Sequence, residues 1–204
     1  MGADVRKLDP LKHEERRRQI LAAAGRCFAR DGFRGASISD ICAEAKISPG
    51  HLYHYFENKE AIVSAMTEAA ISDADIQLEQ LAPTDDPITV VVSRVQSSRA
   101  KNRDATHFLV FDMLAEAGHN PAIARILREQ NRALRTRFAT LLRKGQEIGQ
   151  VDPGLDPELA ASIVISAIDG IKSMNIRDPK LSKDNGATDH LAMLITRFLR
   201  PPRT

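Results

Sequence analysis

The chain has 204 residues, of which 43% are hydrophobic and 27% charged, a composition typical of a globular protein with a buried core. No apolar run approaches the ~20 residues that span a bilayer, and the charged N-terminal segment lacks the apolar centre of a secretory signal. We therefore expect a cytoplasmic protein with no membrane partner. The net charge of +2 lies entirely within residues 1–60, which weakly indicates a polyanionic partner, although a solvated helix face explains it as well.

Cys27 and Cys42 are the two cysteines of the chain. Two cysteines are too few for a disulfide framework, and no residues have the spacing of zinc ligands. We interpret both as small core residues and keep a redox-sensing pair as the alternative. We expect no cofactor and no metal.

Helical periodicity begins at residues 15–31, where apolar residues recur on one face, and Gly32 is predicted to end this helix. Ser37 is a good N-cap for a second helix, with Asp40 as its capping-box partner. Ser48-Pro49 predicts a third, short helix, with serine at the N-cap and proline at the first helical position. Asn58 is expected to cap a fourth helix that runs towards Leu81.

A break at residues 82–87 separates these helices from longer ones. A helix is predicted from Ile88, although residues 89–92 are β-branched enough to leave a short strand open. Further helices are predicted at residues 105–117, which are apolar almost all round, from Asn120-Pro121 to Gly149, and at residues 157–175. A last amphipathic helix ends before Pro201-Pro202. Strand signals are nearly absent, so the predicted fold class is all-α.

Residues 37–56 contain two short helices separated by residues 46–48, the spacing of a helix-turn-helix whose second helix enters the DNA major groove. The outward residues at the start of that second helix are small, flat or hydrogen-bonding, as a groove-reading helix requires. The predicted inward residues are apolar: Ile38, Ile41, Ala45, Ile47, Leu52 and Phe56.

The segment from Ser37 to Glu60, SISDICAEAKISPGHLYHYFENKE, resembles the TetR family of one-component regulators. The pattern of that family is T-I-x-x-I-A-x-x-A-G-V-S-x-G-x-x-Y-x-Y-F-x-x-K-E, and residues 52–56 followed by Lys59-Glu60 are its most specific part. The strong match covers about residues 15–65. The opening at Asn120-Pro121 resembles the branch that includes choline-responsive repressors, without assigning a ligand.

The resemblance implies that the hydroxyls of Tyr53 and Tyr55 bond phosphates and that His51 and His54 point towards bases or phosphates. It also implies that the Lys59 ammonium pairs with a phosphate. It also implies that a glycine lets the backbone approach DNA closely and that Arg16, Arg17 and Arg18 lie near the flanking backbone. The residues assigned to DNA are Ser37, Ser48, Pro49, Gly50, His51, Tyr53, His54, Tyr55 and Lys59.

Alternatives remain for several of these residues. The tyrosines could be half-buried aromatics and the histidines plain surface residues. Lys59 could be a solvated charge, but a cation at a helix start opposes the helix dipole, and a phosphate would explain it. Lys46 replaces the family's glycine, where a positive φ costs roughly 1 kcal/mol. Cys42 replaces the common alanine and is interpreted as core.

The resemblance divides the chain into a helix-turn-helix DNA-binding domain, residues 1–60, and a helical effector-binding and dimerisation domain, residues 61–204. A homodimer is expected because half-sites mirror a protein two-fold axis; a monomeric core is the alternative. The predicted dimer interface consists of Ile163, Ala167, Ile171, Met174, Leu191, Leu194, Ile195 and Phe198. The predicted ligand contacts, each of which could be plain core, are Phe108, Phe111, Asp112 and Met113, with Phe138 opposite.

The resulting prediction is a ligand-responsive regulator, a repressor by family resemblance, that binds a palindromic double-stranded DNA operator and is released by a small-molecule effector. One alternative is a constitutive, architectural DNA-binding protein without an effector. Another is a helical enzyme that uses His107, Asp112 or His119, although no nucleophile–base spacing supports it. Asp112, Glu116 and His119 share a helix face and leave a metal or cation site open.

Overall fold

The computed structural model of the chain describes residues 10–79, 86–97, 105–178, 180 and 186–202. All the elements in these ranges are α-helices, which confirms the predicted all-α class. None of the described helices is both long and apolar enough to cross a membrane. The chain forms two compact units, one of Met1–Thr67 with Phe108–Ile126 and the other of Glu68–His107 with Leu127–Thr204.

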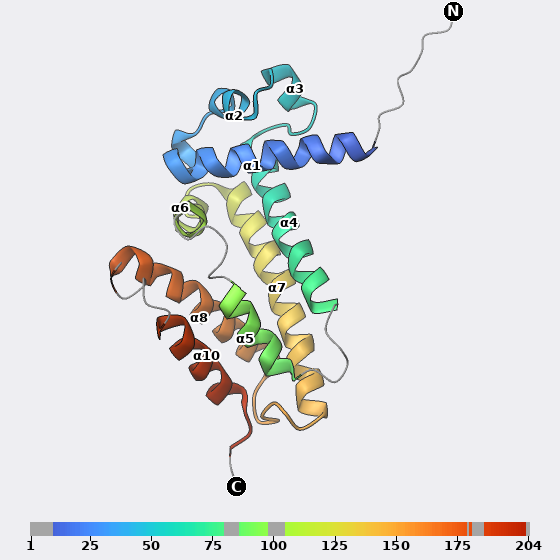
Figure 1. Cartoon of the computed structure of the whole chain (residues 1–204), viewed down its shortest axis with the longest axis vertical. Helices are drawn as coiled ribbons and strands as arrows, with labels where there is room; N and C mark the ends of the chain where they lie inside the picture. Colours follow the sequence, from blue (N-terminus) through green and yellow to red (C-terminus); the bar gives the residue numbers. More distant parts are fainter. Residues whose placement is uncertain (1–9, 80–85, 98–104, 179, 181–185, 203–204) are drawn as a thin grey trace, which may run out of the picture. The chain divides into compact units, whose positions relative to one another are not determined.

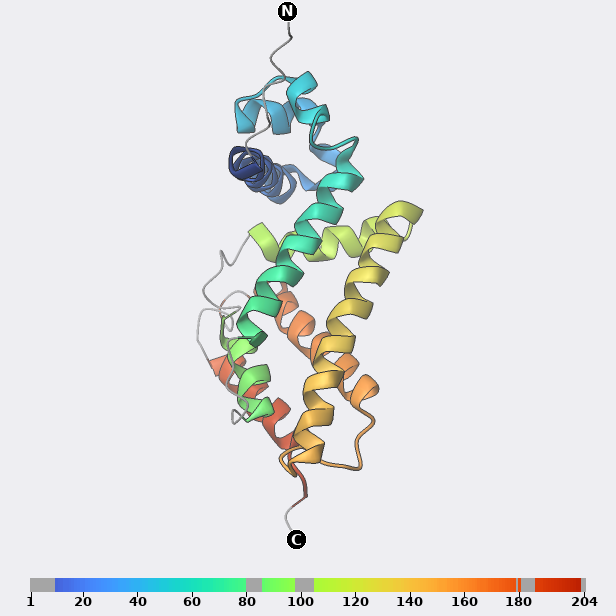
Figure 2. The same cartoon turned by 90° about the vertical axis from the view of Figure 1, so that its right-hand side faces the viewer.

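The first unit is built on one long helix, and the two helices of the predicted helix-turn-helix lie on the same side of it (Figures 1 and 2). Two helices from later in the chain complete the unit. Its elements are α1 (Pro10–Gly35), α2 (Ile38–Ala45), α3 (Pro49–Tyr53), the start of α4 (Lys59–Glu79), most of α6 (Ala105–Ala117) and the start of α7 (Pro121–Glu147).

Helix α1 begins earlier than predicted, at Pro10, and carries a buried apolar face. Gly32 interrupts the helix with φ 72° and ψ 169°, and one further turn continues to Gly35. Glycine adopts this left-handed φ without the clash that a Cβ would cause. The predicted stop at Gly32 is therefore a break within the element rather than its end.

The caps of the helix-turn-helix follow the sequence prediction. The Ser37 hydroxyl accepts a hydrogen bond from the Asp40 N–H (3.1 Å), while the Asp40 carboxylate accepts one from the Ser37 N–H (2.8 Å). Lys46 ends α2 in the left-handed conformation, with φ 54° and ψ 49°. Ser48 caps α3 by accepting from the His51 N–H (3.2 Å). These local bonds satisfy helix-end donors that would otherwise lack partners.

The second unit is a helical bundle of α5 (Pro87–Ser97), the longer part of α7, α8 (Pro157–Arg177) and α10 (Gly186–Leu199), and α4 from Glu68 onward also belongs to this unit (Figures 1 and 2). The strand alternative at residues 89–92 is wrong, because these residues belong to α5. All four helices contribute to one core: Ile88, Val91, Val95, Phe138, Ala139, Leu142, Val151, Ala160, Ala161, Val164, Ile165, Ile195 and Leu199.

The compact units do not follow the division predicted at residues 60 and 61. Residues of α6 and the start of α7 belong to the same unit as the helix-turn-helix. Periodicity along the sequence could not reveal this, because α6 is apolar almost all round and has no single core face.

Candidate nucleic-acid interface

Helix α3 presents a short exposed turn on a buried anchor. Leu52 is fully buried, whereas Tyr53 is 54% exposed, and Ser48, Pro49, Gly50, His51 and His54 are exposed as well. Ile41 and Phe56 are buried beside Leu52 as predicted, while Ile38, Ala45 and Ile47 are half-buried. The helix N-terminus therefore offers polar and small side chains to solvent in the arrangement that groove reading requires.

Gly50 has no internal reason to be glycine. A Cβ at this position would meet no atom within 4 Å, and the residue does not adopt a positive φ. Glycine inside a helix is destabilising by roughly 0.5–1 kcal/mol relative to alanine. A surface that approaches α3 closely from outside the chain would explain the residue.

An aromatic and imidazole cluster surrounds Tyr55, which is half-buried. The His13 ring from α1 stacks on the Tyr55 ring with centroids 4.6 Å apart and an interplanar angle of 29°. The rings of His51 and His54 lie 5.5 Å from the same tyrosine ring. Sequence reasoning missed His13, because it lay outside the predicted helix 15–31 and no local pattern pairs it with Tyr55.

Ser37 is held by its cap. Its hydroxyl donates to the Asp40 carboxylate at 2.5 Å and accepts from the Asp40 N–H. Hydrogen bonds from the Ser37 hydroxyl and backbone N–H hold the pKa of Asp40 below its usual value. The phosphate contact of Ser37 stays a prediction, whereas the capping role is present in the structure.

Lys59, at the start of α4, has partners within the chain that the sequence did not reveal. Its ammonium donates to the carbonyl oxygens of Phe33 (2.7 Å) and Ala36 (2.9 Å) and lies 4.6 Å from the centre of the Phe33 ring. The carbonyls at the end of α1 supply the negative pole that a phosphate was expected to supply. These internal partners explain the cation at the helix start, and the residue is an anchor of the first unit. The phosphate contact of Lys59 stays a prediction.

Arg16, Arg17 and Arg18, three consecutive arginines of α1, have contacts within the first unit. Arg16 donates to the Gln19 side chain (2.9 Å), the Arg17 guanidinium lies 5.6 Å from the centre of the Phe56 ring, and Arg18 lies 3.9 Å from Glu14. Their predicted place beside the flanking DNA backbone stays a prediction.

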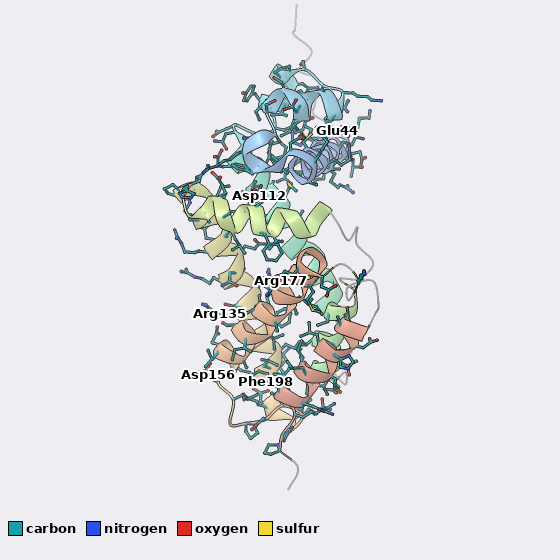
Figure 3. The ribbon with its side chains drawn as sticks, turned by 90° about the vertical axis from the view of Figure 1, so that its left-hand side faces the viewer. Glu44, Asp112, Arg135, Asp156, Arg177 and Phe198 are labelled. Atoms are coloured by element: carbon teal, nitrogen blue, oxygen red, sulfur yellow. The ribbon has the colours of Figure 1, made fainter. Side chains whose placement is uncertain are left out.

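Asp112 of α6 binds the end of α1 within the first unit (Figure 3). Its carboxylate accepts a hydrogen bond from the Phe33 N–H at 2.5 Å, and a Cβ at Gly32 would lie 3.4 Å from the same carboxylate. Asp112 is therefore engaged by α1, which corrects its predicted role as a ligand contact.

Two further polar contacts link α6 and the turn after it to α1 and α4. Arg34 of α1 binds Glu116 of α6 at 2.6 Å, and the Asn120 amide, in the turn after α6, donates to the Glu60 carboxylate of α4 at 2.9 Å. We call Asp112, Glu116 and Asn120 the α6 latch. In the described part of the chain, no group of three or more histidine, cysteine, aspartate or glutamate side chains is placed to hold a metal ion.

The other predicted ligand contacts are divided between the two units. Phe111 is half-buried and Met113 is 5% exposed in the first unit. Phe138 is 7% exposed and packs in the core of the second unit. The Phe108 side chain lies outside the described residues.

The predicted dimer face mixes exposed and core residues. Ile163 is 46% exposed and Leu194 is 58% exposed, while Ala167, Ile171 and Met174 are half-buried. Ile195 is 1% exposed and belongs to the core of the second unit, which corrects its assignment to the interface. Leu191 and Phe198 are half-buried and pack against that core, and their place in an interface stays a prediction. The exposed apolar side chains that the prediction omitted are Leu159 and Met193.

Both cysteines are buried, as the sequence suggested. Burial raises the pKa of the Cys27 thiol and of the Cys42 thiol. A raised pKa disfavours the reactive thiolate at neutral pH, which favours the core interpretation over a redox-sensing pair.

The helix-turn-helix with its exposed α3 defines the class of this protein as a DNA-binding transcriptional regulator, and comparison with known proteins gives its family. Residues 20–66 match the family model described as bacterial regulatory proteins, tetR family. Residues 92–200 match the one described as BetI-type transcriptional repressor, C-terminal. The chain belongs to the TetR family of bacterial transcriptional regulators. It is a regulator and not an enzyme, so the helical-enzyme alternative falls.

Similar proteins agree with this assignment. The chain is 29% identical over 157 residues to the HTH-type transcriptional regulator UidR of Escherichia coli K12, covering 76% of this chain and 79% of UidR. It is 27% identical over 147 residues to the HTH-type transcriptional repressor KstR2 of Rhodococcus jostii, covering 71% of this chain and 72% of KstR2.

Two solved structures share the fold. Salmonella enterica GusR aligns with a TM-score of 0.78 and 25% identity over 91% of this chain and 95% of GusR. A transcriptional regulator from Saccharomonospora viridis in complex with choline aligns with a TM-score of 0.75 and 23% identity, covering 93% of this chain and all of that one. Both alignments extend over the two compact units.

Proposed function

We propose that this protein is a homodimeric repressor that acts in the cytoplasm. It binds a palindromic double-stranded DNA operator through one α3 per protomer and leaves it when a small-molecule effector binds. The observation that supports the proposal is the exposed turn from Ser48 to His54. Buried Leu52 anchors this turn, and no packing or backbone conformation within the chain requires glycine at position 50.

In this proposal the exposed turn reads the major groove. His51 and His54 contact base edges or phosphates, and the hydroxyls of Tyr53 and Tyr55 donate to phosphates. Ser48 and Pro49 lie at the groove edge, and Ser37 adds a phosphate contact beyond its cap. The arginines at positions 16–18 of α1 flank the site.

Dimerisation is proposed through α8 and α10. Leu159 and Ile163 on α8, and Met193 and Leu194 on α10, are large apolar side chains between 43% and 62% exposed. Apolar side chains in such numbers on two contacting helices are typical of a surface that another protein covers. Gly170 of α8 has no atom within 4 Å of a Cβ position, which leaves room for a second helix to approach.

The effector is proposed to act on α6, where Phe111 and Met113 are the remaining candidates for contact. A shift of α6 changes the α6 latch, whose Asp112 holds the N–H of Phe33 while Lys59 holds the carbonyl of the same residue. The backbone between α1 and α2 is thereby coupled to α6 through bonds within one unit. A coupling free energy of ~1–3 kcal/mol is enough for a useful switch.

The test begins with selection of duplexes that the full-length protein retains from a random DNA pool. Tyr53→Ala is then expected to weaken binding of the selected duplex by about tenfold, with Tyr53→Phe isolating the share of one hydroxyl hydrogen bond. His119→Ala, a change to an exposed histidine outside the helix-turn-helix, is the matched control. Retention of no duplex, or unchanged affinity in Tyr53→Ala, contradicts the assignment of α3.

A thermal-shift screen of metabolites tests the effector. Choline is a suitable first compound, because the Saccharomonospora viridis regulator was solved with it. A compound that raises the melting temperature and releases the selected duplex supports a ligand-responsive repressor. Tight duplex binding that no stabilising compound relieves favours the constitutive DNA-binding alternative.

A further inference from the structure

His13 joins the first turn of α1 to the end of α3. Its half-buried imidazole stacks on the Tyr55 ring at 4.6 Å, and the His54 ring meets it edge-on at 6.4 Å with an interplanar angle of 77°. Residues 13 and 55 are distant in the sequence, so only the packing of α3 beside α1 brings the rings together. Stacked rings at this separation attract one another and restrict each other's orientation.

The orientation of Tyr55 depends on that stack. The tyrosine follows α3, in the turn before α4, where no regular helical pattern fixes its side chain. The rings of His51 and His54 touch it from α3, and His13 is the contribution of α1. Removing His13 leaves the face of Tyr55 that points to α1 without this support.

The ring contacts of His13 are with the turn that follows α3. Tyr55 and His54 contact its ring, and His51 of α3 contacts the ring of Tyr55. On α1, Arg16 and Arg17 lie one turn away, and Glu14 lies within 3.9 Å of Arg18. Among the described residues, no carboxylate forms an ion pair with His13.

We propose that His13 is a positioning residue for DNA binding, which holds Tyr55 in its phosphate-facing orientation by stacking on its ring. The inference rests on the proposed function, because it takes the α3 surface as the DNA interface.

The experiment measures binding of the selected duplex by fluorescence anisotropy at fixed pH and fixed salt. His13→Ala is expected to weaken binding by about three- to tenfold, the range for one aromatic stack. His13→Phe keeps a ring that can stack on Tyr55 and is expected to restore the affinity. His119→Ala is expected to behave as the wild type.

Three results decide the inference. Equal affinity of His13→Ala and wild type overturns it. An affinity of His13→Phe as low as that of His13→Ala overturns the role of the stack, since a ring at this position then fails to position Tyr55. Failure of the wild type to retain any duplex overturns the proposed function. This outcome needs no His13 variant and is therefore distinct from failure of the inference about His13. Thermal melts of each variant separate loss of binding from loss of folding.

Discussion

Gly50 is the residue whose identity depends most clearly on something outside the chain. A Cβ there meets nothing, so Gly50→Ala is expected to leave the melting temperature unchanged or to raise it, with a gain of up to ~1 kcal/mol in the free energy of unfolding. The same change is expected to weaken binding of the selected duplex by about tenfold, because the new methyl group stands where the DNA backbone approaches. Anisotropy titrations and thermal melts of the two proteins test both halves. An alanine variant that binds as tightly as the wild type would contradict the close approach.

Lys59, unlike Gly50, is explained by contacts within the chain. Lys59→Met keeps the apolar stem but removes the donor to the carbonyls of Phe33 and Ala36. We expect a loss of ~1–3 kcal/mol in the free energy of unfolding of the first unit, the cost of stranding part-buried acceptors. Urea denaturation followed by circular dichroism measures it.

A second lysine provides the control of opposite sign. Lys46 adopts a left-handed φ of 54°, so Lys46→Gly is expected to stabilise the protein by up to ~1 kcal/mol in the same urea titration. An unchanged free energy of unfolding in Lys59→Met would show that Lys59 is a solvated charge.

The Ser37–Asp40 cap gives a dependence on pH. Because the folded state lowers the pKa of Asp40, its contribution to stability is complete above the ordinary aspartate pKa of ~3.9 and is lost as the pH falls through the lowered value. Asp40→Asn is therefore expected to be less stable than the wild type at neutral pH, and the difference is expected to shrink in acid. Thermal melts across the acid range test this, and a difference that grows in acid would contradict it.

The helix caps could be predicted from the sequence, because capping hydrogen bonds are local. The Ser37–Asp40 box and the caps at Ser48 and Asn58 each involve partners within three residues, and all are present in the structure. The partners of Lys59 and His13 lie 23 or more residues away along the chain. No pattern of spacing encodes such contacts, because they depend on how α1, α3 and α4 pack.

At the scale of elements, α6 is the helix that changed most between expectation and structure. Asp112→Ala removes the acceptor of the Phe33 N–H and is expected to cost ~1–2 kcal/mol in the free energy of unfolding. Hydrogen exchange is the direct measurement, since the amide of Phe33 should exchange faster in the variant than in the wild type. Asp112→Asn keeps a carbonyl acceptor and is the matched control.

The α6 latch also carries the proposed coupling. If it transmits the effector signal, Asp112→Ala should bind the selected duplex but release it less completely when the effector is added. Full release in this variant would place the coupling elsewhere.

In α10, periodicity along the sequence does not separate core residues from residues exposed to a partner. Leu194 and Ile195 fall on the same apolar stripe of the sequence, yet Leu194 is 58% exposed and Ile195 is 1% exposed. A stripe broad enough for two surfaces shows that the helix buries more than one face. It does not show which residue meets the core of its own chain and which is left for a partner.

At the scale of the whole molecule, the exposed faces of α8 and α10 predict the oligomeric state. Ile163→Lys and Leu194→Lys together are expected to give a monomer, because a partner helix would have to bury two charges that lack counterions. Light scattering after size-exclusion chromatography measures the mass. Ile148→Lys, at a residue 56% exposed at the end of α7, introduces the same charge outside these helices and should leave the mass unchanged. A dimer in the double variant would move the interface away from this face.

The place of residues 108–126 in the first unit sets a rule for building chimeric biosensors from this protein. A junction at residue 67 would give the reading helices to a foreign sensory part and leave behind the carboxylate that holds the Phe33 amide, together with the Asn120 amide that binds Glu60. Such a fusion would carry α3 on a weakened support. A graft that transplants two segments, residues 10–67 and residues 108–126, would preserve the operator specificity of this regulator under a new chemical input.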